Sequence, residues 1–515
     1  MLARKLPVPV GTCCAPPQLA PYFNNSDGAD FLERQGLPLN ASGEAIAAHI
    51  WELSCFSQPP LDDAGWRTVL YTALYHALCA PTTASDADGA YVGLDGRVAA
   101  APSAGLGVYF SDLSLWDIHR TQTPLLALLH PAASASLSAS LLAMAKARGG
   151  VLPRWPFASV ETGIMCADHG IAVLADAIAK RVPGVDVNES WLAANSTLAA
   201  RDAATAYPEL GWVPLEESHG WCKPGSLTLE YAQDDAAAAG LAAAAGDAAA
   251  AAALVTRSKS YAHLWSPAAT SFCPRHANGT LVCTNATLLA PFPFENSWTE
   301  ADAAQMAFYV PGDPAGLVEL FGEAAFLGTY DSLFAATPSW PFGNFMPNAY
   351  VWYGNEPSML IPWQAAFAGP LGAARVAATT RSLLRAYYTT RFDGVPGNDD
   401  YGTLSAGAVF ALLGLYPLAA SANGAYILGS PTFANVSVAL GEGAGAPRLT
   451  VLAHNASSSR VFVAAATLNG AALPSPIVQH AALLTPPSLL EFFMTDTPVP
   501  WGDASGSSTA GAARR

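Results

Sequence analysis

The sequence contains few charged residues. Asp, Glu, Lys and Arg make up 12% of the 515 residues, whereas apolar residues reach 51%; an ordinary soluble domain carries about 25% charged residues. This composition predicts a well-filled core, with disorder expected only in the Gly-, Ser- and Ala-rich tail 503–515. A chain of this length can form two or three domains, or one large toroid with an appendage.

Basic residues are fewer than acidic residues. The chain has 24 Lys and Arg against 40 Asp and Glu, which gives a formal net charge of −16. Such a surface repels phosphate backbones, so nucleic acid is not expected as a partner. An acidic surface does suit cations and neutral sugars.

Signals for zinc, for a membrane span and for an N-terminal leader are also missing from the sequence. It contains no Cys-x-x-Cys pair and no His-x-x-x-His spacing. The Ala-rich run 236–254 is interrupted by Gly240, Gly246 and Asp247, and alanine gains little from lipid, so we expect a packing helix there. The first ten residues are broken by prolines and do not resemble a signal peptide, so we expect the natural N terminus to lie upstream.

Potential N-glycosylation sites are frequent, by contrast. Half of the 16 asparagines begin an Asn-x-Ser/Thr sequence, whereas chance predicts about two or three. The eight cysteines fit an oxidising compartment, and Cys273 and Cys283 bracket a short hairpin that a disulfide could close. We expect a glycoprotein of the secretory pathway or the extracellular space, with composition bias as the alternative. The eight sites are Asn24, Asn40, Asn188, Asn195, Asn278, Asn285, Asn435 and Asn455.

Apolar residues recur at helical spacing through much of the chain. From Trp66 to Leu78 they follow the i, i+3, i+4 pattern, and a proline ends it. Asp313-Pro314 begins another such stretch with a capping carboxylate and a proline at the first helical position. The pattern predicts a mainly α fold, a toroid of helical hairpins over residues 61–420. The other stretches lie near 123–147, 169–182, 226–257, 300–310, 370–388 and 404–416.

The two ends of the chain differ from this helical part. Residues 1–60 are rich in proline and weakly periodic, and are interpreted as a linker or the remnant of an earlier domain. Leu449–Ala453 and Arg460–Leu468 alternate like strands, and Asn469-Gly470 is a strong hairpin turn. We therefore expect a small C-terminal β-sandwich portion over residues 421–502.

Aromatic residues lie beside polar ones in several loops that contain Gly and Pro. Trp352-Tyr-Gly-Asn-Glu-Pro357 is an example. Rings stack on the C–H faces of sugars while amides, carboxylates and guanidinium groups bind hydroxyls, so such loops suit carbohydrate. A single aromatic residue more often belongs to the core, but the repeated combination favours sugar binding.

A first acidic position is Glu300, which follows Ser297-Trp298-Thr299 and enters a helical stretch that contains Gln305. A carboxyl group beside an indole and partly removed from water has a raised pKa, as a general acid requires. The alternative is an acidic residue in the first turn of a helix, where the helix dipole favours it.

A second acidic position is the turn Gly397-Asn398-Asp399-Asp400, which follows Asp393 and precedes a helix at Thr403. Crowding raises the cost of ionising all three carboxyls unless a cation or a hydroxyl-rich ligand is present. The alternative is a solvated turn in which Asp caps the helix. The turn lacks the alternating oxygen ligands and the closing Glu of an EF-hand loop.

Two further clusters have simple structural explanations. Asp117 and Arg120 are three residues apart and, on a helix, would face one side and pair with each other. Asp168 could orient His169, although a histidine with a purely structural role is the stronger interpretation.

Taken in order, these segments resemble glycoside hydrolase family 92, the calcium-dependent exo-α-mannosidases. The resemblance covers roughly residues 60–502. It implies an (α/α)6 toroid packed against a β-sandwich, hydrolysis of α-mannosides with inversion, and Ca²⁺ as cofactor. Terminal mannose on N-glycans or mannose-rich glycans would be the substrate. The matching stretches are Tyr71–Pro81, Ser85–Gly89, Ser111–Arg120, Thr228–Asp235, Gly354–Pro357, Pro396–Gly402, Gly429–Pro431 and Leu468–Gly470.

The resemblance also implies roles for single residues. Glu300 would be the general acid, because its spacing to Gln305 matches the family's acidic motif. Asp400 would be the base, with Asn398 or Asp399 assisting the attacking water. Ca²⁺ would bind the 2- and 3-hydroxyls of mannose, with ligands that the spacing does not assign. The residues that would line the sugar site or support it are Asn355, Glu356, Gln305, Trp116, Asp117 and Arg120.

Three departures from the family pattern leave alternatives open. The acidic motif Glu-Gly-Asn-Ala-Trp-Gln is replaced by Glu300-Ala-Asp-Ala-Ala-Gln305, and the usual His pair after Gly-Asn-Glu-Pro is replaced by Met359-Leu360. The N-terminal β-sandwich of the family has no counterpart in this sequence, which leaves the activity of the chain by itself open. The alternatives are a glycan-binding pseudoenzyme and an inverting glycosidase for another sugar, such as glucose.

Overall fold

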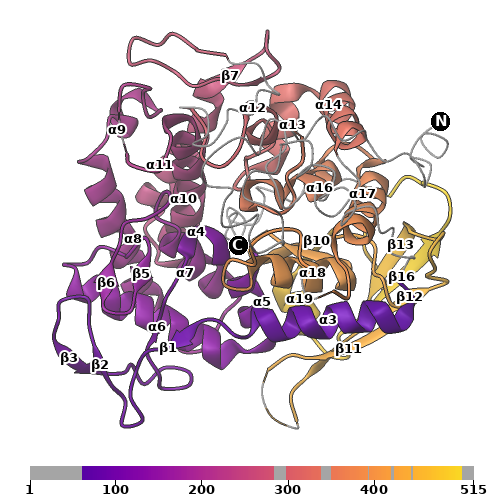
Figure 1. Ribbon diagram of the computed structural model, residues 1–515, viewed down its shortest axis with the longest axis horizontal. Helices are drawn as coiled ribbons and strands as arrows, with labels where there is room; N and C mark the ends of the chain where they lie inside the picture. The colour runs from indigo at the N-terminus through magenta and orange to yellow at the C-terminus, as the bar shows by residue number, and fades with distance from the viewer. Residues whose placement is uncertain are drawn as a thin grey trace, which may run out of the picture.

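The computed structural model of the protein describes residues 61–217, 219–283, 297–337, 350–391, 394–418, 423–441, 443 and 445–501. Helices are the most frequent elements of this part, and strands gather towards its C-terminal end (Figure 1). The prediction of a mainly α fold with a C-terminal β region is therefore confirmed. The predicted linker 1–60 and the predicted tail 503–515 lie outside the described residues.

The helices follow the periodic stretches of the sequence, some of which divide into two helices. The α-helices of the described residues are α3 (Asp63–Ala77), α4 (Leu115–Ile118), α5 (Gln122–Leu129), α6 (Pro131–Ala147), α7 (Gly170–Ala179), α8 (Val187–Asp202), α9 (Tyr207–Leu210), α10 (Pro224–Ala244), α11 (Ala248–Arg257), α12 (Ala303–Met306), α13 (Pro314–Phe321), α14 (Glu323–Ala336), α16 (Ile361–Gln364), α17 (Gly372–Tyr387), α18 (Thr403–Leu413) and α19 (His480–Leu483). Short 3-10 helices are η5 (Ser260–Leu264), η6 (Glu356–Ser358) and η7 (Ala365–Phe367).

Aspartate caps begin several of these helices. The Asp62 carboxylate accepts a hydrogen bond from Gly65 N at the start of α3. Asp313 accepts one from Gly316 N at the start of α13, which confirms the start signal at Asp313-Pro314. Asp186 caps α8, a helix that the periodicity did not reveal because its apolar residues do not gather on one side.

The Ala-rich run of the sequence lies in α10 and α11. α10 packs against α7, α8 and α11 (Figure 1). Ala237, Ala238 and Ala242 on α10 are fully buried, and such small side chains let neighbouring helices approach closely. The prediction of a packing helix is confirmed for α10, whereas the run is divided before Asp247 and α11 buries only Leu254. Among the described residues, no helix is both long enough and apolar enough to cross a membrane.

The strands of the described residues form two larger sheets and several two-stranded ones. They are β1 (Thr82–Thr83), β2 (Ala90–Val92), β3 (Val98–Ala100), β4 (Phe110–Ser111), β5 (Pro156–Phe157), β6 (Val160–Glu161), β7 (Trp265–Ser266), β8 (Ser271–Phe272), β9 (Leu415–Pro417), β10 (Ala425–Leu428), β11 (Asn435–Ala439), β12 (Arg448–His454), β13 (Phe462–Leu468), β14 (Ala471–Ala472), β15 (Ile477–Gln479) and β16 (Leu489–Thr495). The larger sheets have the orders β15-β10-β9 and β11-β12-β16-β13-β14.

The C-terminal strands follow the sequence prediction. The two predicted strand segments become β12 and β13, which both pair with β16, β12 in parallel and β13 antiparallel. Asn469 and Gly470 join β13 to β14 with φ values of 54° and 79°. Positive φ at both central residues is the conformation of a two-residue hairpin, which confirms that turn.

A large hydrophobic cluster runs through helices and strands, and a second one lies among the helices of residues 109–254. The large cluster extends from Trp66 on α3 to Trp501 near the end of the described chain. β9 lies before residue 420 and pairs with β10 after it. The division into a helical and a β domain at that residue stays a prediction, and the packing is continuous across it.

Two glycines allow the main chain to pack tightly next to the acidic turn at residues 397–400. Gly402 has a φ of +84°, and a Cβ there would lie 2.6 Å from Ala77 Cα at the end of α3. A Cβ on Gly397 would lie 2.0 Å from Gly354 O. The acidic turn therefore contacts α3 on one side and the loop at Gly354 on the other through backbone atoms.

We expect Gly402→Ala to destabilise the protein by about 2 kcal/mol or more, because the new Cβ meets Ala77 and the positive φ disfavours any side chain. Urea unfolding followed by circular dichroism measures the change. Gly328→Ala is the matched control, since Gly328 is exposed within α14 and has open space around the Cβ position. That substitution should be neutral or stabilise by up to about 1 kcal/mol; equal effects of the two would contradict the role of Gly402.

Candidate active site

Four carboxyl groups from distant parts of the chain come together in the structure. Asp117 lies on α4, Glu300 lies before α12, Glu356 begins η6, and Asp400 lies in the turn before α18. Oxygen atoms of Asp117, Glu356 and Asp400 all lie within 4.8 Å of one another. The charge of Glu300 contributes to the raised pKa values of both Asp117 and Glu356. The structure thus brings together both acidic positions that the sequence singled out.

Glu300 is held by the loop that carries Asn355. Asn355 Nδ2 donates to the backbone oxygen of Glu300 at 3.0 Å and to its Oε2 at 3.2 Å. The backbone of Glu300 has a φ of +50°, a conformation that residues other than glycine rarely adopt. Such backbone conformations persist only where the surroundings impose them, and they often occur at functional sites.

Glu300 does not lie in the first turn of a helix, so that alternative is wrong. The helix α12 begins three residues later, because the Asp302 side chain accepts from Ala304 N and Gln305 N. Gln305 Oε1 completes this capping box by accepting from Asp302 N at 3.3 Å. The structure gives Gln305 a helix-capping contact, and its binding to substrate stays a prediction.

The pKa of the Glu300 carboxyl is raised. Burial is the largest cause, and the charge of Asp400 adds to it, whereas the hydrogen bond from Asn355 and the charge of Arg120 oppose it. A carboxyl with a raised pKa keeps its proton to a higher pH than usual and is therefore better suited to donate that proton to a leaving group.

The acidic turn before α18 has an unusual backbone. Asp400, Tyr401 and Gly402 follow one another with φ values of 42°, 57° and 84°. Asp399 Oδ1 accepts from Ser405 N at 2.8 Å, so this side chain caps α18, while Asn398 is exposed. Burial is the main cause that raises the pKa of Asp400. Asp400 is therefore the carboxyl of this turn that joins the buried acidic group.

Asp117 and Glu356 are both buried, and their pKa values are raised well above the ordinary range. Burial is the first cause for each, followed by the repulsion among the neighbouring carboxyls. Both side-chain oxygens of Glu356 lack a hydrogen-bond partner among the described residues. Crowded carboxylate oxygens without donors are ligands that a hard cation such as Ca²⁺ prefers, so these residues fit such an ion.

The charge of Arg120 opposes the rise in the pKa of both Asp117 and Glu356. Its side chain donates to Tyr309 Oη at 2.8 Å and lies 3.8 Å from Glu230. The expectation that Arg120 simply pairs with Asp117 is therefore wrong. Arg120 packs instead over the ring of Trp116, with 4.9 Å between its Cζ and the ring centroid.

Glu230 connects these residues to α10, and the sequence assigned no role to it. Trp116 Nε1 donates to Glu230 Oε1 at 3.0 Å, and Tyr309 Oη donates to Oε2 at 2.7 Å. His169 Nε2 lies 3.1 Å from Glu230 Oε2. Two sequence signals pointed to this residue, its place in the stretch Thr228–Asp235 and its charge within an Ala-rich helix.

Each ring nitrogen of His169 contacts a carboxylate. Besides Glu230, its Nδ1 contacts Asp234 Oδ1 at 2.9 Å. Asp234 orients the ring, and the hypothesis that Asp168 does so is wrong; Asp168 N donates instead to Asp234 Oδ2. Burial alone would lower the pKa of His169, but the two carboxylates raise it to about 9.

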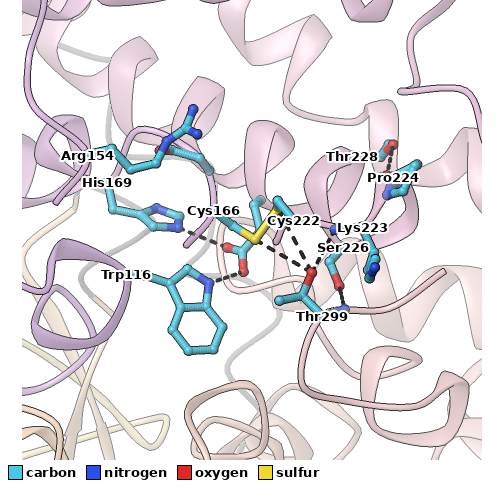
Figure 2. The surroundings of a disulfide bond; sticks show 12 residues. Trp116, Arg154, Cys166, His169, Cys222, Lys223, Pro224, Ser226, Thr228 and Thr299 are labelled. Atoms are coloured by element: carbon cyan, nitrogen blue, oxygen red, sulfur yellow. Dashed lines mark hydrogen bonds and ion pairs between the residues drawn. A yellow bond between two sulfur atoms is a disulfide. The ribbon is translucent and has the colours of Figure 1, made fainter. Parts of the chain in front are cut away.

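Two disulfides lie in the described part of the chain. Cys273 and Cys283 are bonded, which confirms the hairpin closure that the sequence suggested. Cys166 and Cys222 form a second bond, which the sequence did not reveal. Figure 2 shows this bond beside Thr299, one residue before Glu300.

The potential glycosylation sites that fall within the described residues are all exposed. Their side chains can therefore be reached by a modifying enzyme. The exposed asparagines are Asn188, Asn195, Asn278, Asn435 and Asn455. The remaining three, Asn24, Asn40 and Asn285, lie outside the described residues.

The chain is similar to known glycosyl hydrolases in sequence and in structure. The model of the glycosyl hydrolase family 92 catalytic domain matches residues 51–496. The structure of a family GH92 α-mannosidase from Bacteroides thetaiotaomicron in complex with mannoimidazole is similar, with a TM-score of 0.76 and 26% identity. The match covers 92% of this chain and 62% of that one.

Two other relatives support the same comparison. The family GH92 inverting mannosidase from Bacteroides thetaiotaomicron VPI-5482 matches with a TM-score of 0.72 at 24% identity, which shows the fold alone; 92% of this chain and 66% of that chain are covered. An uncharacterized secreted glycosidase of Arthroderma benhamiae is 28% identical over 212 residues, 39% of this chain and 25% of that protein. The chain thus spans less than two thirds of the length of each of these relatives.

Because the folded state raises the pKa of His169 from 6.5 to about 9, protonation of this residue stabilises the fold. The contribution is fully present below pH 6.5 and is lost as the pH rises through about 9. It amounts to roughly 3 kcal/mol. His169→Gln should remove this part of the pH dependence, measured as the difference between the free energies of unfolding of parent and variant at pH 6, 8 and 9.5. A difference that does not change with pH would contradict a charged His169.

Proposed function

Since the chain belongs to glycosyl hydrolase family 92, we propose that it is an α-mannosidase that removes terminal α-linked mannose from N-glycans or other mannose-rich glycans. The observation that carries the proposal is the convergence of Glu300 with the acidic group of Asp117, Glu356 and Asp400. Family membership also supports the arrangement of the helices as an (α/α)6 toroid against a β-sandwich.

In the proposed reaction, protonated Glu300 gives its proton to the glycosidic oxygen as the bond from that oxygen to the sugar C1 breaks. The Asp400 carboxylate removes a proton from a water molecule that attacks C1 from the opposite face, with Asn398 or Asp399 assisting this water. The product is mannose of inverted configuration, which requires a separation of about 6.5–9.5 Å between the two carboxyls. The raised pKa of Glu300 supports its role as the acid.

The remaining predicted residues would bind the sugar or support the site. Asn355 and Glu356 follow one another at the edge of η6, and Trp116 and Asp117 lie on α4. Asn355 already contacts the acid, and the Arg120 guanidinium stacks on the Trp116 ring. We propose these residues, together with Gln305, as the sugar-binding set.

Asp117 and Glu356 would hold a calcium ion beside Asp400, the proposed base. Carboxylate oxygens are preferred ligands of Ca²⁺, and the two unpartnered oxygens of Glu356 supply the clearest place for it. When bound, the ion would offset the repulsion among the carboxylates and polarise sugar hydroxyls. The chain's own residues would carry out both proton transfers.

The exposed glycosylation sites support maturation in the secretory pathway or outside the cell. Sugar attachment needs exposed asparagines, and all five sites that the structure describes are exposed. The two disulfides fit the same oxidising compartment.

Hydrolysis of 4-nitrophenyl α-mannoside, compared with the matched α-glucoside, tests the function. Glu300→Gln and Asp400→Asn should each lower kcat by about 10²- to 10⁴-fold, because each removes one proton transfer. Proton NMR of the first product should show β-mannose. Glu209→Gln, an exposed change on α9, is the control and should leave kcat unchanged.

Three outcomes would contradict this proposal. Faster release of glucose would favour another sugar specificity, and mannoside binding without hydrolysis would favour a glycan-binding pseudoenzyme. Release of α-mannose as the first product would exclude inversion.

Calcium binding provides a separate test, because it can be measured without substrate. Glu356→Gln should weaken Ca²⁺ binding at least tenfold in isothermal titration calorimetry, since it removes one buried carboxylate from the acidic group. Chelation with EGTA should lower the mannosidase activity of the parent chain, and added Ca²⁺ should restore it. Unchanged affinity in Glu356→Gln, with Glu209→Gln as control, would rule out this ligand set.

A further inference from the structure

The disulfide between Cys166 and Cys222 joins two segments that are 56 residues apart. Cys166 lies in the loop before α7, and Cys222 lies two residues before α10. Both cysteines are buried. The bond therefore ties the start of α10, the helix that carries Glu230, to the loop that leads to His169.

Thr299 lies directly on this disulfide (Figure 2). Its Oγ1 is 3.6 Å from Cys166 Sγ and 4.0 Å from Cys222 Sγ, so the hydroxyl faces both sulfur atoms. The same oxygen accepts a hydrogen bond from Lys223 N at 2.8 Å. One side chain thus contacts both ends of the cross-link and the first backbone amide after it.

The segment that leads to Glu300 is fixed to α10 by backbone contacts as well. Gly225 N donates to Ser297 O at 3.1 Å, and Thr299 N donates to Ser226 Oγ at 2.8 Å. A Cβ on Gly225 would lie 2.6 Å from Ser297 O and 2.8 Å from the ring of Trp298. No side chain separates the two segments there, so a shift of the start of α10 would move the segment 297–299.

Glu300 is the next residue, and it is held between two anchors. On one side Thr299 binds it to the disulfide and α10, and on the other Asn355 binds its backbone oxygen and its carboxyl group. Its left-handed backbone, with φ of +50°, requires support from the surroundings. Release of either anchor would let the backbone relax and displace the carboxyl.

We propose that the Cys166–Cys222 disulfide and the Thr299 hydroxyl are positioning groups for the acid of the reaction, Glu300. The inference rests on the proposed function, and it names residues that touch neither the sugar nor the reacting atoms. A displacement of about 1 Å in a catalytic group can lower a rate about 10²-fold. Loss of these groups should therefore affect the step that depends on the acid.

Leaving-group dependence reveals such a displacement. Phenyl α-mannoside needs a proton on its departing oxygen, whereas 2,4-dinitrophenyl α-mannoside has a leaving group stable enough to depart without one. A misplaced acid therefore slows the first substrate and spares the second. General loss of structure would slow both equally. Glu300→Gln removes the acid altogether and therefore shows the largest difference between the two substrates that loss of the acid can cause.

The test compares kcat/KM for the two substrates in four variants of the full chain. Thr299→Val removes the hydroxyl at nearly constant volume, and Thr299→Ser retains it. Cys166→Ala with Cys222→Ala removes the buried disulfide, and Cys273→Ala with Cys283→Ala removes the other disulfide as a matched control. Thr299→Val and the first double variant should lose at least tenfold on the phenyl substrate and less than threefold on the dinitrophenyl substrate. Thr299→Ser and the control double variant should show no selective loss.

If the variant with Cys166→Ala and Cys222→Ala does not fold, Thr299→Val still tests the inference. Equal losses on both substrates, or none in Thr299→Val, would overturn the inference while leaving the proposed function intact. A parent chain that hydrolyses neither mannoside would instead overturn the proposed function, and with it any role for Glu300 as an acid.

Discussion

Carboxyl groups that share a small buried region repel one another when ionised. This repulsion decides which charge states and which ligands the group of Asp117, Glu356 and Asp400 can accept. Burial and mutual charge both act against full ionisation of Asp117 and Glu356. A divalent cation together with a neutral, hydroxyl-rich ligand relieves this repulsion, whereas an anionic ligand would increase it. This buried acidic group therefore favours neutral sugars over phosphates, as does the acidic composition of the whole chain.

The scaffold around this group consists of charges that are paired inside the protein. Glu230 accepts hydrogen bonds from Trp116 and Tyr309 and lies beside His169, while Arg120 donates to Tyr309. Compared with apolar side chains in the same place, buried pairs of this kind add little net stability, because desolvation offsets much of the attraction; removing one charge of a pair, such as that of His169, is costly because its partner stays buried. What they do contribute is a defined orientation for each ring and each guanidinium group. The chain has few charges, and several of them are used in this way.

Local signals of the sequence predicted much of the fold. Asp313-Pro314, Asn469-Gly470 and the pair Cys273 and Cys283 each depend on residues close in the chain, and all three are confirmed. The Asp302 cap moved the start of α12 past Glu300 because a competing carboxylate lay two residues further on. The side-chain contacts of Glu230 with other elements and the bond between Cys166 and Cys222 join residues that are at least 56 positions apart in the sequence. Such contacts depend on how helices pack, and no spacing in one sequence specifies them.

The continuous core has a consequence for the way the molecule loses its structure. β9 pairs with β10 across residue 420, and one cluster of buried side chains runs from Trp66 to Trp501, so the C-terminal strands share this core with part of the helices. A second cluster lies among the helices of residues 109–254 alone. Loosening of the C-terminal strands would expose the side of α17 that packs on β13. The stability of a sheet remote in sequence is thereby coupled to the helices that share its core, among them α18, which follows a turn that carries one of the carboxyl groups.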